Sequence, residues 1–336
     1  MHISGKERIF AVDYAKTLGI FLVCIGHFLP AGSTLRTFLY SFHVPLFFLL
    51  AGLTTSAKKE NKRTILQRLL ALCKRVLVPY TIWFWISALP AYFLWGASLS
   101  ELIRNYLFLN GRTLWNTALW FLPCYFIVMC FFEVICYISG GNKTVLSISA
   151  ILTFVAAVVF ETFGVTECLL GINKCCLMYA LVVIGYLVKE HILLNSSPMK
   201  IAIGSIVFTV LGVFSCLFHA GDNISIMNVD YNNIYIFFAV AVCMCLSFVI
   251  ICTVFPRCKL VIMIAKSSLF IMSTHLVVRQ LFDLLIQLGR YELQKVYVYL
   301  GVIIIPIYIV VVLIYEKLAV RCKVLRRVGQ WIGLAL

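Results

Sequence analysis

The sequence predicts an all-α protein: a polytopic integral membrane helix bundle with about ten transmembrane helices. Three observations support this prediction, namely an apolar composition, apolar runs of membrane-spanning length, and an uneven distribution of basic residues among the loops. Of the 336 residues, 63% are hydrophobic and 12% are charged, and the mean hydropathy is +1.03. Soluble domains are about half apolar and about a quarter charged. The composition therefore excludes an ordinary soluble globular protein.

Runs of about 20 apolar residues, the length at which a helix crosses a bilayer, mark the expected spans. In chain order these are residues 9–29, 36–55, 76–96, 118–138, 144–162, 175–188, 200–219, 233–254, 260–280 and 296–316. The ninth span has a second possible start, because Lys266 and the two serines after it also fit a span over 267–288 that contains Arg279 and Asp283. No linker or low-complexity segment separates the runs, so we expect one transmembrane domain over residues 1–336.

The basic residues predict the orientation. The net charge is +15, and with a cytoplasmic N-terminus the cytoplasmic segments hold about three times as many Lys and Arg as the outer segments. This distribution satisfies the positive-inside rule. We therefore expect both termini in the cytoplasm. Topology and contact with anionic membrane lipids explain the basic excess without nucleic acid as a partner.

The first span is the most unusual, because it carries Asp13, Lys16 and His27. Ionisable residues at membrane depth are costly and are by default candidates for a functional site. Lys16 and His27 are eleven residues apart, so a helix places both on one face, about 16 Å apart along its axis. Asp13, three residues before Lys16, lies on the same side. A purely structural Asp13–Lys16 pair remains an alternative.

Two further histidines fall at a depth similar to that of His27. The second span places His43 near its outer end, and the ninth places His275 between its middle and its outer end. The fourth span begins outside, next to Trp120. A structural role remains open for each histidine, since a single histidine in a span is often a packed, hydrogen-bonded residue. With cations inside and imidazoles outside, the bundle suits a reaction whose anionic cofactor enters from the cytosol.

A basic cluster precedes the predicted third span and contains Arg68, Lys74 and Arg75. The positive-inside rule explains it most simply. A basic strip beside the entrance to a bundle also suits phosphate groups, to which Arg donates paired hydrogen bonds. Both interpretations stay open at this point.

These residues resemble the membrane acyltransferase-3 family, ten-span enzymes that O-acylate sugars and cell-envelope glycans in bacteria. The N-terminal signature of the family is similar to Arg8, Asp13–Lys16 and Gly26–His27, including a basic residue separated by ten others from a histidine. Four later motifs occur in the family's order: Phe42–Phe48 with Gly52, Arg75–Tyr80, Leu119–Leu122, and Ala265–Leu269 ending in His275.

One departure concerns the third-span motif. The family often has a second arginine three positions before the one that matches Arg75, and this chain has Leu72 there. Lys74 and Arg68 are the available substitutes. The departure bears on the cofactor contacts and not on the family, because the five motifs extend in order over most of the chain.

The resemblance implies a transmembrane acyltransferase domain in the bacterial cytoplasmic (inner) membrane. It would move an acyl group, usually acetyl, from acyl-CoA to a hydroxyl of a sugar or cell-envelope glycan. Acetyl-CoA is then the expected donor, and no metal is expected. The competing hypothesis is a transporter or flippase of an envelope intermediate that performs no acyl transfer, since intramembrane His, Asp and Lys also serve as ion relays.

The resemblance also implies roles for individual residues. His27 is the expected general base, because neutral imidazole accepts protons near physiological pH. Asp13 and Lys16 would shape the cavity and its charge, with Lys16 facing the phosphorylated end of the cofactor. His43 would bind donor or acceptor, and whether it shares the chemistry with His27 stays open. The remaining candidates are Arg68 and Arg75 for the cofactor phosphates, and Trp120 and His275 for the acceptor.

Overall fold

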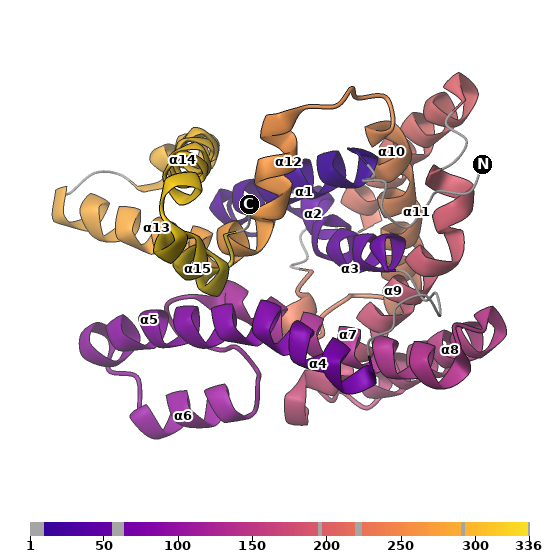
Figure 1. The fold of residues 1–336 in the computed structure, drawn as a ribbon, viewed down its shortest axis with the longest axis horizontal. Coiled ribbons are helices and arrows are strands. Elements are labelled where there is room, and N and C mark those ends of the chain that lie inside the picture. Colours follow the sequence, from indigo (N-terminus) through magenta and orange to yellow (C-terminus); the bar gives the residue numbers. More distant parts are fainter. Residues whose placement is uncertain (1–9, 56–63, 194–196, 219–223, 290–292, 335–336) are drawn as a thin grey trace.

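The described part of the chain is a bundle of helices. The computed structural model describes residues 10–55, 64–193, 197–218, 224–289 and 293–334 (Figure 1). Within these residues every named element is a helix, and the one isolated backbone bridge joins Ser225 and Asp230. The prediction of an all-α fold is confirmed. Arg8, the first residue of the N-terminal signature, lies outside the described residues.

The helices follow the predicted spans closely. In chain order they are α1 (Phe10–Phe28), α2 (Thr34–Tyr40), α3 (His43–Thr54), α4 (Ile65–Leu72), the π-helical segment η1 (Cys73–Leu77), α5 (Val78–Trp95), α6 (Leu99–Leu107), the 3₁₀ segment η2 (Thr117–Trp120), α7 (Phe121–Ser139), α8 (Lys143–Thr162), η3 (Leu169–Gly171), α9 (Ile172–Leu193), α10 (Pro198–Phe218), η4 (Ile226–Asn228), α11 (Ile234–Cys252), α12 (Lys259–Lys266), α13 (Ser268–Gly289), α14 (Leu293–Arg321) and α15 (Lys323–Ile332).

The described helices confirm a multi-pass membrane protein. Nine helical segments in the described residues are long and apolar enough to cross a membrane, and the bent pair α12 and α13 makes up to ten. The two helices of this pair meet at 70°. Because α13 begins at Ser268 and contains Arg279 and Asp283, the later of the two predicted starts describes the ninth span.

Two spans differ from the predicted runs. The third is helical from Ile65 to Trp95, so Arg68 and Arg75 lie on a helix and not in a loop. The second is interrupted between α2 and α3, and His43 is the first residue of α3. Pro45 therefore lies in the first turn of α3, where the missing N–H costs no intrahelical hydrogen bond.

The closest crossing in the bundle joins α3 and α9. A Cβ atom on Gly52 would lie 1.9 Å from the carbonyl oxygen of Val182, and one on Gly185 would lie 2.1 Å from that of Leu49. Only glycine allows two helix backbones to approach this closely, as in small-residue crossings of membrane helices. At the end of the same crossing, Lys189 Nζ donates to the carbonyl of Thr55 at 3.1 Å. The crossing fixes α3, and with it the position of His43.

Helix α1 lies in the middle of the bundle. It packs against α3 and α11 on one side and against α12, α13 and α14 on the other (Figure 1). Helices α4, α5, α7 and α8 lie along one side of the bundle in the same view, where α7 and α8 pack against α9. We call the end of the bundle at which α1 begins the N-terminal face, and the end near His27 the opposite face. Successive spans alternate between the two faces.

Candidate functional site

Three histidines from separate helices lie close together at the end of α1. The ring centroids of His27 and His275 are 5.0 Å apart. Tyr40 lies between His27 and His43. Its ring centroid is 5.9 Å from that of His27 and 4.7 Å from that of His43. The sequence placed the three histidines at a similar depth, and the fold brings them into one cluster. We call His27, Tyr40, His43 and His275 the ring cluster.

Two of these imidazoles are fixed by their own helices. Nδ1 of His43 is hydrogen-bonded to the carbonyl of Leu39. Nδ1 of His275 lies 3.1 Å from the carbonyl of Ile271 and 3.0 Å from that of Met272. Because a carbonyl oxygen only accepts, each of these Nδ1 atoms carries the proton, and each Nε2 retains its lone pair. Both rings are therefore held as acceptors at Nε2.

His27 is the accessible member of the three. The His43 side chain is 1% exposed and that of His275 is fully buried, whereas His27 is partly exposed. Nδ1 of His27 lies 3.3 Å from the hydroxyl of Tyr40. If the imidazole donates this hydrogen bond, its Nε2 is an unprotonated acceptor with access to a substrate. A base held in place by a third group is the usual arrangement for an activated nucleophile.

Two arginines lie against the C-terminal end of α1. Arg279 Nη1 donates to the carbonyl of His27, and Arg36 Nη1 donates to that of Leu29 at 3.4 Å. The Arg36 guanidinium lies 4.8 Å from the centre of the Tyr40 ring. The last carbonyls of a helix have no partner within it and carry partial negative charge. The arginines satisfy these carbonyls and place positive charge beside the ring cluster.

Asp13 and Lys16 lie toward the other end of α1. The helix is continuous from Phe10 to Phe28, so the separation of about 16 Å between Lys16 and His27 is retained. Asp13 is buried, with 6% exposure, and Lys16 is partly exposed. These two residues do not contact the ring cluster. They lie toward the N-terminal face.

Contacts with the loop before α12 and with α12 itself fix this half of α1. Tyr14 donates from its hydroxyl to the carbonyl of Pro256 at 2.8 Å, and Thr17 donates to that of Val261 at 2.9 Å. Helix α12 thus lies along the part of α1 that carries Asp13 and Lys16. Its last residue, Lys266, lies where α12 meets α13.

Arg68 and Arg75 lie on the side of the bundle formed by α4, η1 and α7. Arg68 Nη1 is 3.3 Å from a carboxylate oxygen of Glu133 on α7, and both side chains are mostly buried. Arg75 is exposed on η1. Helices α4 and η1 pack against α7. The two arginines that the sequence grouped therefore differ in environment, since Arg68 is ion-paired and Arg75 is exposed.

The amphipathic helix α15 packs beside the helices that carry Arg68 and Arg75. The sequence did not predict this contact. It packs against α5, η1 and α14. The indole N–H of Trp83 donates to the carbonyl of Ile332 at 3.0 Å. Gly329 packs so closely on Tyr315 that a Cβ atom would lie 2.0 Å from its hydroxyl. The exposed basic side chains of α15 therefore lie on a helix that packs against η1, the segment that holds Arg75.

Trp120 is more enclosed than an acceptor platform needs to be. Its side chain is 9% exposed, and Lys174 Nζ lies 5.5 Å from the centre of its ring. The same ammonium donates to the carbonyl of Met227 at 3.2 Å. Lys174 thus lies beside the indole ring, where the sequence analysis expected a sugar acceptor.

Asn116 connects the segment before Trp120 to α13. Its Nδ2 donates to the carbonyl of Ser273 at 2.8 Å and lies 3.2 Å from Oγ of Ser87. Ser273 is two residues before His275. The fourth-span motif is thereby held beside the ring cluster, although no contact between Trp120 and a histidine of the cluster is recorded in the described residues.

The described residues contain no group of three or more His, Cys, Asp or Glu side chains arranged to hold a metal ion.

Comparison with known protein families gives one match. The family model described as an acyltransferase domain matches residues 9–316, which is nearly the whole chain. Searches of curated proteins and of solved structures gave no significant match. The family match contains every residue of the ring cluster together with Asp13, Lys16, Arg68 and Arg75. The chain belongs to the membrane acyltransferase-3 family.

Proposed function

We propose that the protein transfers an acetyl group from acetyl-CoA to a hydroxyl of a sugar or cell-envelope glycan, with His27 as the general base. The family supports acyl transfer. The ring cluster supports the assignment of the base, because it joins a partly exposed imidazole to a tyrosine hydroxyl and two buried imidazoles. This cluster is the observation that carries the proposal.

In the proposed reaction, Nε2 of His27 takes the proton of the acceptor hydroxyl as its oxygen attacks the thioester carbonyl. The carbon–sulfur bond then breaks, the new ester forms, and the thiolate of CoA leaves with a proton from the imidazolium. General base catalysis of this kind contributes about 10²–10⁴-fold. Tyr40 holds His27 by accepting from Nδ1–H, which directs the Nε2 lone pair toward the acceptor.

The arginines at the end of α1 support the second requirement of the reaction, the stabilisation of the oxyanion. Negative charge develops on the thioester oxygen during attack, and preorganised donors aimed at that charge often supply the largest catalytic contribution. Arg279 and Arg36 place guanidinium groups beside His27. We assign this electrostatic role to Arg279 first, because it contacts the backbone of His27 itself.

We propose that the donor enters from the N-terminal face, which we assign to the cytoplasm of a bacterial cell. The basic residues of the loops and the position of Lys16 support this direction. Arg75 is the stronger candidate for a cofactor phosphate, since Arg68 already binds Glu133. Asp13 would help to shape the cavity near Lys16. The acetyl end of acetyl-CoA would then extend along α1 and place its thioester at the ring cluster.

On the acceptor side, His43 and His275 are buried and would form the wall behind His27 and Tyr40. In the tautomers that the backbone imposes, their Nε2 atoms are hydrogen-bond acceptors. Nε2 of His275 is buried without a hydrogen-bond partner among the described residues. Trp120 offers little surface of its own, so we assign it to the wall of the acceptor site.

The test is transfer of label from acetyl-CoA. Purified protein in nanodiscs is incubated with acetyl-labelled acetyl-CoA and a glycan fraction from bacterial envelopes, and base-labile label on the glycan is measured. The proposal expects glycan-bound label that depends on active protein. A transporter or flippase without acyl-transfer chemistry would leave the glycan unlabelled.

A further inference from the structure

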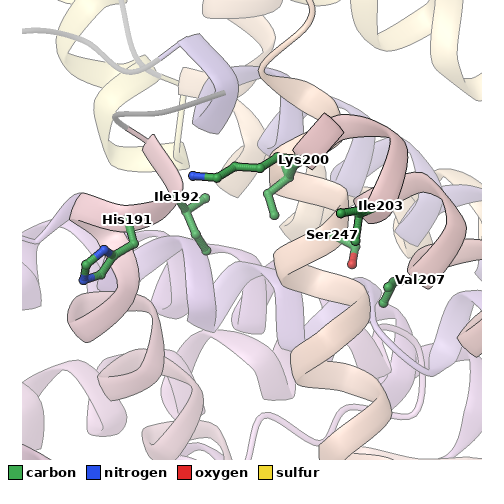
Figure 2. Close-up of a pocket in the computed structure, with 8 residues that line it drawn as sticks. His191, Ile192, Lys200, Ile203, Val207 and Ser247 are labelled. Carbon is green, nitrogen blue, oxygen red and sulfur yellow. The ribbon is translucent and has the colours of Figure 1, made fainter. Parts of the chain in front are cut away.

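A cavity outside the ring cluster lies between α9, α10 and α11. Its volume is about 310 Å³, and it is partly open to the surroundings (Figure 2). It lies where α9 ends and α10 begins, on the N-terminal face. The cavity lies at the other end of the bundle from the ring cluster, none of the residues assigned to the reaction lines it, and its use does not depend on the proposed function.

The walls of this cavity are mainly apolar. Ile192, Ile203, Val207 and Ile250 line it, and Gly204 forms part of the floor. A Cβ atom on Gly204 would lie 3.3 Å from Cγ2 of Ile250, so α10 and α11 pack closely at this point. The cavity thus offers an apolar interior to a chain-like ligand.

The α10 wall of the cavity continues into an exposed apolar surface on the same helix. Ile203, which lines the cavity, is 53% exposed, and Ile206 and Val210 on α10 are 63% and 60% exposed. On a membrane-spanning helix such an apolar surface lies against acyl chains. Ile203 belongs both to the cavity lining and to this exposed surface.

A cationic side chain lies at the rim. Lys200, in the first turn of α10, is exposed and forms no ion pair with a described residue. Figure 2 shows its ammonium directed toward the end of α9, where Ile192 lies, while Ile203 and Val207 lie farther along α10. His191 also lines the cavity at this end. Among the described residues, the acid nearest to Lys200 in the sequence is Glu190, whose Oε2 lies 4.0 Å from Lys143 Nζ.

We propose that this cavity binds one acyl chain of an anionic phospholipid, whose phosphate lies against Lys200. The arrangement of an apolar interior below a cationic rim matches the two parts of such a lipid. Its volume is near the lower limit of about 300–1,000 Å³ for small-molecule sites, so it accommodates part of one tail and leaves the headgroup outside. A basic residue at the surface of an anionic membrane strengthens the attraction of the headgroup.

The test measures lipid retention and not acyl transfer. The purified full-length protein is delipidated in detergent and titrated with phosphatidylglycerol or phosphatidylcholine, and bound lipid is counted by native mass spectrometry. We expect tighter binding of phosphatidylglycerol. Lys200→Ala should weaken it about fivefold, the loss that corresponds to one basic residue near a membrane surface. Lys317→Ala, an exposed lysine of α14 on the same face, is the matched control and should leave it unchanged.

A second variant separates the apolar part from the charge. Ile203→Trp places a larger side chain at the partly exposed wall, so it should reduce retention of both lipids without disturbing the buried packing. Equal binding of the two lipids would overturn the proposal. It would also be overturned if Lys200→Ala and Lys317→Ala had the same effect, or if Ile203→Trp retained both lipids as the unmodified protein does. Thermal unfolding of each variant confirms that it is folded.

Discussion

The two ends of the proposed reaction path differ in how the protein builds them. At the ring cluster, side chains from α1, α2, α3 and α13 lie within ring-contact distance, and two of the histidines are buried and bonded to backbone carbonyls. At the N-terminal face, Arg75 is exposed and Arg68 is bound to Glu133. Proton transfer requires fixed geometry, whereas a flexible, highly charged cofactor is captured by accessible charge. The contrast fits a division between chemistry and donor binding.

The largest expected effect is at His27. His27→Ala should reduce acetyl transfer at least a hundredfold, because a general base contributes about 10²–10⁴-fold. His43→Ala should retain more activity, since that ring is buried behind Tyr40. Rates are measured with labelled acetyl-CoA at saturating acceptor. Equal losses in the two variants would break the comparison, because they would assign the chemistry to both histidines.

Arg279→Gln comes next. It should lower kcat about tenfold with little change in KM for acetyl-CoA, because the guanidinium acts on charge that develops in the transition state. Arg279→Lys, which keeps the charge, should recover part of the loss. A change confined to KM would move Arg279 from the chemistry to donor binding.

Tyr40→Phe tests the positioning of the base. Loss of one hydrogen bond of about 1 kcal/mol corresponds to about a fivefold decrease in kcat. Tyr299→Phe removes a hydroxyl from a tyrosine that is 70% exposed on α14 and serves as the matched control. If both variants had the same rate as the unmodified protein, Tyr40 would not orient His27.

The smallest expected effect is at the donor end. Arg75→Ala should raise KM for acetyl-CoA about threefold, as expected for one accessible charge worth about 0.5–1 kcal/mol. Arg68→Ala should change KM less and instead lower the melting temperature, because it breaks the contact with Glu133. Arg321→Ala, another exposed arginine, is the control. A larger KM change for Arg68 than for Arg75 would reverse the two assignments.

Much of the fold could be predicted from the sequence, because membrane spans are encoded by length and composition alone. Ten runs were expected, and the described residues contain nine clear spans and one bent pair. Breaks were harder to predict. The interruption between α2 and α3 occurs within one apolar run, and hydropathy does not detect it. The extension of the third span back to Ile65 was missed because basic residues there resemble a loop.

The candidate site was predictable in part. Histidines in apolar runs identified His27, His43 and His275, and depth along alternating spans placed them together. Tyr40 gave no signal, since a tyrosine near a membrane surface is common and its contact with His27 depends on helix rotation. Arg279 did give a sequence signal, because an arginine inside a membrane span is by default a functional candidate. Arg68 and Glu133 are 65 residues apart in the sequence and lie on different helices, so residue spacing within one helix does not predict their contact.

The most direct test of the central claim is chemical rescue of His27→Ala by added imidazole. The account expects His27→Ala to be nearly inactive in acetyl transfer and to regain a concentration-dependent part of the rate with imidazole. It expects no such recovery in Arg279→Gln, whose base is intact. Acetyl transfer by His27→Ala at the rate of the unmodified protein, without imidazole, would contradict the account.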